Sequence, residues 1–238
     1  MLLCSRNTAS QFAGLAPPAQ RNNQEITAER DLNEYDIFIR SNQAISIVHK
    51  ILAKHNGTFL DSVVSSRKPF GLPTNYVPRD AGIPCQFIQK IGLKFADRKD
   101  VSDPFELLNK WKMIAPKAPI AGQTDFTKPV NIYYESNTCI LPPGTCCTES
   151  FIVLFAADTK EEVESFKTYL FTKTARFLLL MSVVSQDITK DRYRFVPNLG
   201  KYDGVYTDDM LIEKWGISPE EWNYIQSRIG EPSSAKNE

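Results

Sequence analysis

The residues of this chain best suited to binding chemistry gather at positions 65–75, where two adjacent cations stand among hydroxyl and amide side chains. Arg67 and Lys68 are followed at once by Pro69, whose ring fixes its own φ. A restricted backbone loses less conformational freedom on binding, so such a turn holds its side chains ready for a ligand. Arginine bridges the two acceptors of a guanine edge and lysine pairs with phosphate, so the stretch suits a nucleic acid. The candidate DNA contacts here are Ser65, Ser66, Arg67, Lys68, Thr74 and Asn75.

A second basic stretch, rich in proline, supplies further candidates. It belongs to residues 50–128, which carry 13 Lys and Arg against 7 Asp and Glu, whereas residues 129–238 carry 11 against 16. DNA binding rests largely on neutralising phosphates, so we expect the middle third to face DNA and the acidic last third to face protein. A chance fluctuation over one mixed surface is the alternative. The candidate DNA contacts in this stretch are Lys110, Lys112, Lys117 and Gln123.

The other informative segment, residues 141–155, is a tight polar turn that runs directly into an apolar strand. The turn is built on Pro-Pro-Gly at 142–144, and Cys146 and Cys147 follow it. Reactive-thiol chemistry needs a nearby base, and neither histidine is close in sequence, so we expect the cysteine pair to be a buried part of the turn. In the first segment, Phe70 is likewise expected to plug the core rather than to act as an inserted wedge.

These segments, together with the closing helices, resemble the C-terminal target-recognition (specificity) domain of adenine-specific DNA methyltransferases and of the bifunctional type II restriction–modification enzymes related to them. The resemblance spans residues 35–229 and is carried by blocks at 66–75, 142–151 and 173–177 with 195–197. It implies that the chain chooses the DNA sequence in an adenine-methylation or restriction system. The partners it implies are double-stranded DNA and a catalytic methyltransferase or restriction subunit.

No catalytic residue is expected on the chain itself. Such methyltransferases hold adenine with an Asp/Asn-Pro-Pro-aromatic motif and bind S-adenosylmethionine at a glycine-rich turn. The Pro-Pro pairs at 17–18 and 142–143 lack both flanking residue types, and no two glycines stand two apart. S-adenosylmethionine and magnesium are therefore expected only on a partner or on a missing catalytic domain, and neither a cofactor nor a metal is expected here.

Two other functions stay open. Many restriction nucleases hold magnesium with a Pro-Asp followed by an acid-x-Lys, and Asp80, Asp97 and Lys99 approximate that layout, although Arg79 interrupts it. The other alternative is a protein-interaction module without a DNA role. An apolar helix expected near residues 176–184, with the acidic last third, favours contact with a partner subunit.

Composition argues against several other classes. No apolar run reaches the roughly 20 residues that cross a bilayer, so no membrane partner is expected. The five cysteines are odd in number and form no Cys-x-x-Cys pair, and with two histidines a zinc site is not expected. Reduced thiols and a start without a secretory pattern predict a cytoplasmic location.

Apolar periodicity predicts an α+β fold, with a mixed or antiparallel sheet and irregular loops followed by a C-terminal helical segment. Residues 1–34 are expected to be a poorly structured lead-in or linker, and residues 231–238 a disordered tail. Between them we expect one target-recognition domain, 35–230, with a β-rich part at 35–157 and a helical part at 158–230.

Local signals place the individual elements. Strands are expected at residues 37–39, 86–95, 111–114, 137–141 and 151–156. Helices are expected from about 42 to 56, 158 to 171, 174 to 185, 208 to 215 and 219 to 229. The clearest signals are Thr207 as an N-cap, Gly216 as a stop, and Ser218 at the start of a capping box with Glu221.

Overall fold

A computed structural model gives the fold of residue 39 and of residues 42–89, 91–119, 128–133, 135–184 and 187–232. The strands are β1 (Ile83–Gln86), β2 (Lys94–Ala96), β3 (Trp111–Pro116), β4 (Cys139–Leu141), β5 (Cys146–Cys147) and β6 (Phe151–Ala157). The α-helices are α1 (Asn42–Lys54), α2 (Lys160–Phe171), α3 (Lys173–Ser182), α4 (Asp208–Trp215) and α5 (Pro219–Arg228). Short 3₁₀ helices are η2 (Leu60–Ser62), η3 (Arg98–Asp100) and η4 (Lys190–Tyr193).

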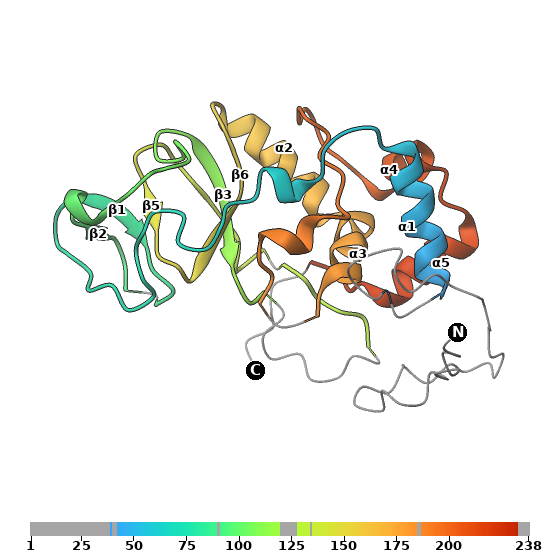
Figure 1. Ribbon diagram of the computed structural model, residues 1–238, viewed down its shortest axis with the longest axis horizontal. Helices are drawn as coiled ribbons and strands as arrows, with labels where there is room; N and C mark the ends of the chain where they lie inside the picture. The colour runs from blue at the N-terminus through green and yellow to red at the C-terminus, as the bar shows by residue number, and fades with distance from the viewer. Residues whose placement is uncertain are drawn as a thin grey trace, which may run out of the picture.

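These elements confirm the predicted α+β class, with one mixed and one antiparallel three-stranded sheet among the described residues and helices closing the described chain. Figure 1 shows β1, β2 and β5 at one end of the molecule, α1, α4 and α5 at the other, and β3 and β6 between them. None of the described helices is long and apolar enough to cross a membrane. The predicted lead-in at 1–34, most of the predicted strand at 37–39 and residues 233–238 lie outside the described residues.

Strand β3 forms the centre of an antiparallel sheet, with β4 on one side and β6 on the other. The side chains of this sheet serve two cores. Met113 and Ile152 belong to a large core shared with the helices, whereas Ile114 and Val153 belong to a smaller core at the β-rich end. A strand buried on both faces carries apolar side chains at successive positions, which is why the sequence of β6 shows no alternation.

The smaller sheet has the order β2-β1-β5, and it corrects one expectation. Strands β1 and β2 are antiparallel, and β1 and β5 are parallel. The single strand expected over residues 86–95 is wrong, because β1 ends at Gln86 and β2 begins at Lys94. The chain reverses between them, where Gly92 has a φ of 74°, a left-handed conformation that costs glycine little.

Helices α2 to α5 follow the local rules of capping. Each begins after a hydroxyl side chain that accepts a main-chain N–H of the first turn, from Thr159, Thr172, Thr207 and Ser218. Ser218 and Glu221 form the predicted capping box. Helix α4 ends at the predicted Gly216, which has a φ of 62°. Such helix ends can be predicted from the local sequence, because a cap involves only residues that are close together in the chain.

Helix α3 lies inside the helical half of the molecule. Phe177 and Leu178 are fully buried, and Arg176 is 1% exposed. The Arg176 guanidinium donates to the carbonyls of Phe171, Thr172 and Gly230, which ties the α2–α3 junction to the segment after α5. Other elements of the chain bury Phe177, Leu178 and Leu179, so these three side chains are not available to a partner subunit. The expected contact of residues 176–184 with a partner stays a prediction.

The capping box gives a direct test of the helical end. Replacing the N-cap in Ser218→Ala removes the acceptor for the Glu221 N–H, and it should lower the free energy of unfolding by about 1 kcal/mol. Ser227→Ala is the matched control, since the exposed hydroxyl of Ser227 donates to the carbonyl of Tyr224 on the same helix and caps no helix start. Urea denaturation should separate the two variants. Equal midpoints for both would contradict the capping assignment.

Candidate nucleic-acid interface

The segment at 65–75 leaves the core through Ser65, which is fixed to β6 at two points. The N–H of Ser65 donates to the carbonyl of Val153 over 2.8 Å, and the N–H of Val153 donates to Oγ of Ser65 over 2.9 Å. Ser65 is 7% exposed, so its hydroxyl anchors the segment and does not face solvent. The next candidate, Ser66, is exposed.

Beyond this anchor, the chain forms a tight turn around Phe70. The N–H of Gly71 donates to the carbonyl of Lys68 over 3.0 Å, and Lys68 itself has a left-handed φ of 56°. Phe70 is fully buried in the smaller core, as expected for a plug. A side chain at Gly71 would place its Cβ 2.9 Å from Oγ of Ser102. The turn is therefore anchored in the smaller core by Phe70, while the side chains of Arg67 and Lys68 remain about half exposed.

Glu149 joins this turn to the second sequence block. Its carboxylate oxygens lie 3.4 Å from Nη2 of Arg67 and 3.5 Å from Nζ of Lys68. Its main-chain N–H donates to the carbonyl of Leu72 over 2.8 Å. The side chains of Arg67 and Lys68 are 52% and 49% exposed, and that of Glu149 is 17% exposed. Two blocks more than 70 positions apart therefore meet at one carboxylate.

Thr74 and Lys117 extend the same group of residues. The hydroxyl of Ser150 lies 3.4 Å from that of Thr74, and the N–H of Lys117 donates to the carbonyl of Ser150 over 3.0 Å. Thr74 and Asn75 are exposed, and Lys117 is half-buried. We call this group the Arg67 cluster, consisting of Arg67, Lys68, Thr74, Asn75, Lys117, Glu149 and Ser150.

Lys110 does not join the Arg67 cluster. Lys110 precedes β3 and Lys117 follows it, so they lie at opposite ends of the strand, roughly 20 Å apart at about 3.3 Å per residue. Gln123 lies outside the described residues. The second basic stretch therefore contributes Lys117 alone to the cluster among the residues that the structure describes.

Lys112 does not join the cluster either, because it is fully buried. Its ammonium donates to the carbonyls of Leu108 (3.3 Å), Pro142 (3.2 Å) and Thr145 (3.0 Å), and it lies 6.0 Å from the centre of the Phe70 ring. An ammonium enclosed in this way cannot reach a DNA backbone. The contact predicted for Lys112 is thus replaced by a structural one, in which Lys112 fastens the 142–145 turn to the chain before β3.

The Pro-Pro-Gly turn is held at further points and leads into β5. The N–H of Gly144 donates to the carbonyl of Leu108 over 2.8 Å. Cys146 and Cys147 are fully buried, as expected. Burial raises the pKa of Cys147, and a hydrogen bond with Cys146, added to burial, raises the pKa of Cys85 on the neighbouring strand. Both groups stay protonated thiols at neutral pH, which is unfavourable for nucleophilic chemistry.

The residues of the nuclease alternative have local partners. Asp80 pairs with Lys94 over 2.7 Å, and this hydrogen bond lowers the pKa of Asp80. Asp97 caps η3 by accepting the N–H of Lys99, and this bond lowers the pKa of Asp97. Among the described residues, no three His, Cys, Asp or Glu side chains are grouped to hold a metal ion. The nuclease alternative stays a prediction, without an observation that favours it.

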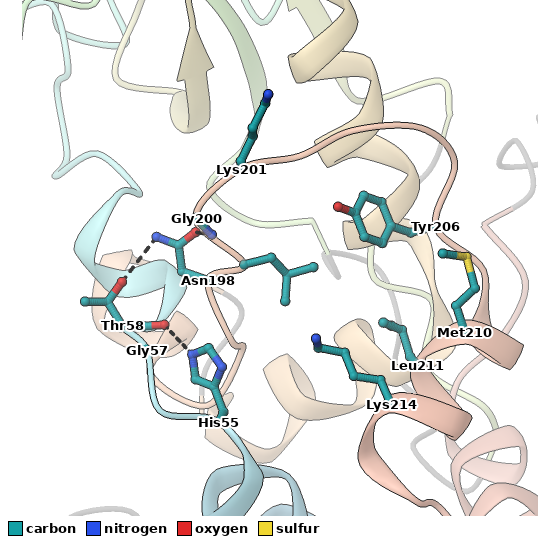
Figure 2. A pocket seen from close by; sticks show the side chains of 11 residues that line it. His55, Gly57, Thr58, Asn198, Gly200, Lys201, Tyr206, Met210, Leu211 and Lys214 are labelled. Carbon is teal, nitrogen blue, oxygen red and sulfur yellow. Dashed lines mark hydrogen bonds between the residues drawn. The ribbon is translucent and has the colours of Figure 1, made fainter.

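A cavity of about 580 Å³ lies between the end of α1, the chain after η4 and helix α4 (Figure 2). Two of its polar side chains bond to Thr58: His55 Nε2 donates to the main-chain carbonyl of Thr58 over 2.7 Å, and the Asn198 amide donates to the Thr58 hydroxyl over 3.3 Å. Lys201 and Lys214 also line it. No residue of the Arg67 cluster does, so the cavity is separate from the candidate interface.

Glu149 is not among the contacts predicted from the sequence, although it lies in the 141–155 segment. A carboxylate is repelled by phosphate, so it was not a candidate for a DNA contact. Only the ion pairs with Arg67 and Lys68 reveal its place. No family model, no curated protein and no solved structure matches this chain.

Lys112 yields a prediction with a defined sign. Burial lowers its pKa in the folded chain from 10.5 to about 8. Between these two values the unfolded chain binds more protons at this position, so the lysine contributes more to stability as the pH rises. The unfolding free energy of wild type minus that of Lys112→Met should therefore increase by about 1–3 kcal/mol between pH 7 and pH 10, at about 1.4 kcal/mol per pKa unit.

Urea denaturation of both proteins at the two pH values measures this difference. The contributions of other titrating groups cancel, because they are the same in the two proteins. Lys160→Met is the control, because Lys160 is exposed and pairs with Glu164 on the same helix. A difference that does not change with pH for Lys112→Met would show that Lys112 titrates as an ordinary surface lysine.

Proposed function

We propose that this chain recognises double-stranded DNA as the specificity module of an adenine-methylating restriction–modification system, with the Arg67 cluster at the contact. The observation that carries the proposal is a turn fixed at both ends whose two cations remain about half exposed, 52% for Arg67 and 49% for Lys68. Fixing a binding turn in advance lowers the entropy lost on association.

The chemistry of the cluster suits both parts of a DNA contact. Arg67 can donate two hydrogen bonds to one guanine edge, and Lys68 and Lys117 can neutralise phosphates. Thr74 and Asn75 are exposed and add a hydroxyl, which lies 3.4 Å from that of Ser150, and an amide; asparagine pairs with the edge of adenine. Contacts to phosphate position a protein on the duplex and contacts to base edges select the sequence, so this composition supports a recognition role.

The proposal leaves catalysis to another polypeptide or another segment. The sequence contains neither an Asp/Asn-Pro-Pro-aromatic motif nor two glycines spaced two apart. We therefore infer a partner that carries the methyltransferase or restriction chemistry. Its expected docking surface is the acidic helical end, where Asp209, Glu213 and Glu220 are exposed on α4 and α5, and which lies away from β1, β2 and β5 (Figure 1).

The salt dependence of DNA binding tests this proposal. The double variant Arg67→Ala/Lys68→Ala should bind a pool of random-sequence duplexes at least about 10-fold more weakly than wild type at 100 mM salt. It should also reduce the slope of log affinity against log salt by about 1–2, since each phosphate contact contributes about 0.9. Fluorescence anisotropy between 50 and 200 mM salt measures both quantities.

The matched control is Lys160→Ala/Lys167→Ala, which removes the same charge from two lysines paired with carboxylates on and near α2. Its affinity and slope should stay close to those of wild type. The proposal fails if wild-type binding does not respond to salt, or if both double variants lose the same affinity. Either outcome would favour an interaction module without a DNA role.

A further inference from the structure

The position of Glu149 is unusual for a surface proposed to meet DNA. A carboxylate next to a phosphate backbone is repelled, and a surface that only neutralised phosphate would be stronger without it. Yet Glu149 lies between the two most exposed cations of the Arg67 cluster. Its main chain is fixed by the bond to Leu72. A carboxylate held there fits a contact that needs an acceptor as well as donors.

The two ion pairs of Glu149 are loose. Their lengths of 3.4 Å and 3.5 Å exceed the roughly 2.7–2.9 Å of charge-assisted hydrogen bonds. Each carboxylate oxygen can accept more than one hydrogen bond, so the group keeps the capacity to accept from a ligand. The cations nevertheless lie near enough to hold the carboxylate in place before DNA arrives.

The spacing of Arg67 and Glu149 matches the edge of one base pair. In a G·C pair the guanine O6 accepts from the cytosine N4 amino group at an ordinary N–H···O distance, about 2.9 Å. The protein offers the complementary pair, a donor on Arg67 Nη2 and an acceptor on Glu149 Oε1, 3.4 Å apart. Arginine can reach both O6 and N7 of guanine, and glutamate accepts from cytosine N4.

We propose, on the basis of the DNA-binding function above, that Arg67 and Glu149 together read one G·C base pair in the major groove. Arg67 donates to guanine O6 and N7, and Glu149 accepts from the N4 amino group of the paired cytosine. Lys68 is then released to a neighbouring phosphate. An A·T pair with adenine in the place of guanine keeps the N7 acceptor but replaces the O6 acceptor by the N6 amino donor, and it places the thymine O4 acceptor opposite the Glu149 carboxylate, which disfavours it.

Selection from random duplexes tests this assignment. Wild type and Glu149→Gln, each as the full chain, are incubated with a random-sequence duplex pool, and the bound DNA is sequenced. Glutamine keeps the shape of the side chain and one acceptor oxygen, but it removes the negative charge and replaces the other acceptor by an N–H₂ donor. The preference for G·C at one position should therefore fall about 10-fold in Glu149→Gln, the size expected when one charge-assisted hydrogen bond is weakened while Arg67 still contacts guanine, and the other positions should keep their preferences.

A base analogue gives the second readout. In the selected duplex, the cytosine at that position is replaced by 2-pyrimidinone, which lacks the N4 amino group. Wild type should lose affinity for this duplex, whereas Glu149→Gln should lose little more than it has already lost. Glu164→Gln, which alters a carboxylate paired with Lys160 on α2, should behave like wild type in both assays. Thermal unfolding confirms that the compared proteins are folded.

The outcomes separate this inference from the function on which it rests. If wild type binds no duplex, the proposed DNA-binding function fails. If wild type selects a sequence and Glu149→Gln selects the same one, Glu149 reads no base and this inference alone is overturned. A Glu149→Gln variant that binds all duplexes more tightly with an unchanged sequence preference also overturns it, because Glu149 would then only screen the two cations.

Discussion

A buried ammonium group holds the β-rich end of this protein together. Lys112 belongs to the central strand β3, and its ammonium donates to three carbonyls, those of Leu108, Pro142 and Thr145. Taking a charge out of water is costly unless hydrogen bonds replace its hydration. Here three carbonyls replace part of it, and burial still lowers the pKa of Lys112 to about 8. The 142–145 turn is thereby fixed relative to the sheet. This also fixes where the following residues lie, Glu149 among them.

The central sheet links this end to the helices. Strands β3 and β6 each contribute side chains to both cores, so the sheet separates the helical half from the small β-rich half. The Arg67 cluster lies where the chain enters β6, with Ser65 and Val153 bonded to each other. Turns that are fixed to a packed sheet keep their side chains in place better than a free loop does. The arrangement suits a contact in which position decides sequence preference.

Local sequence patterns predicted the features that depend on neighbours in the chain. The capping box at Ser218 and the glycine stop of α4 were predicted correctly because capping involves residues within one turn. Lys112 was misjudged because a basic residue in a strand looks like a solvent-facing one until distant carbonyls are known to surround it. The strand expected over 86–95 failed for a similar reason, since one glycine inside an apolar pattern is a weak sign of a reversal. The place of Glu149 in the cluster could not be predicted, because its ion-pair partners Arg67 and Lys68 are about 80 positions away in the sequence.

Lysine footprinting tests the central claim, that the Arg67 cluster is the face that meets DNA, most directly. An amine-selective reagent is applied to the full chain with and without a saturating duplex, and modification at each lysine is read by mass spectrometry. The account predicts that the duplex protects Lys68 and Lys117 and leaves Lys160 and Lys201 reactive, while the buried Lys112 stays unmodified in both samples. Unchanged reactivity of Lys68 under saturating duplex, or protection confined to Lys160 and Lys201, would contradict it.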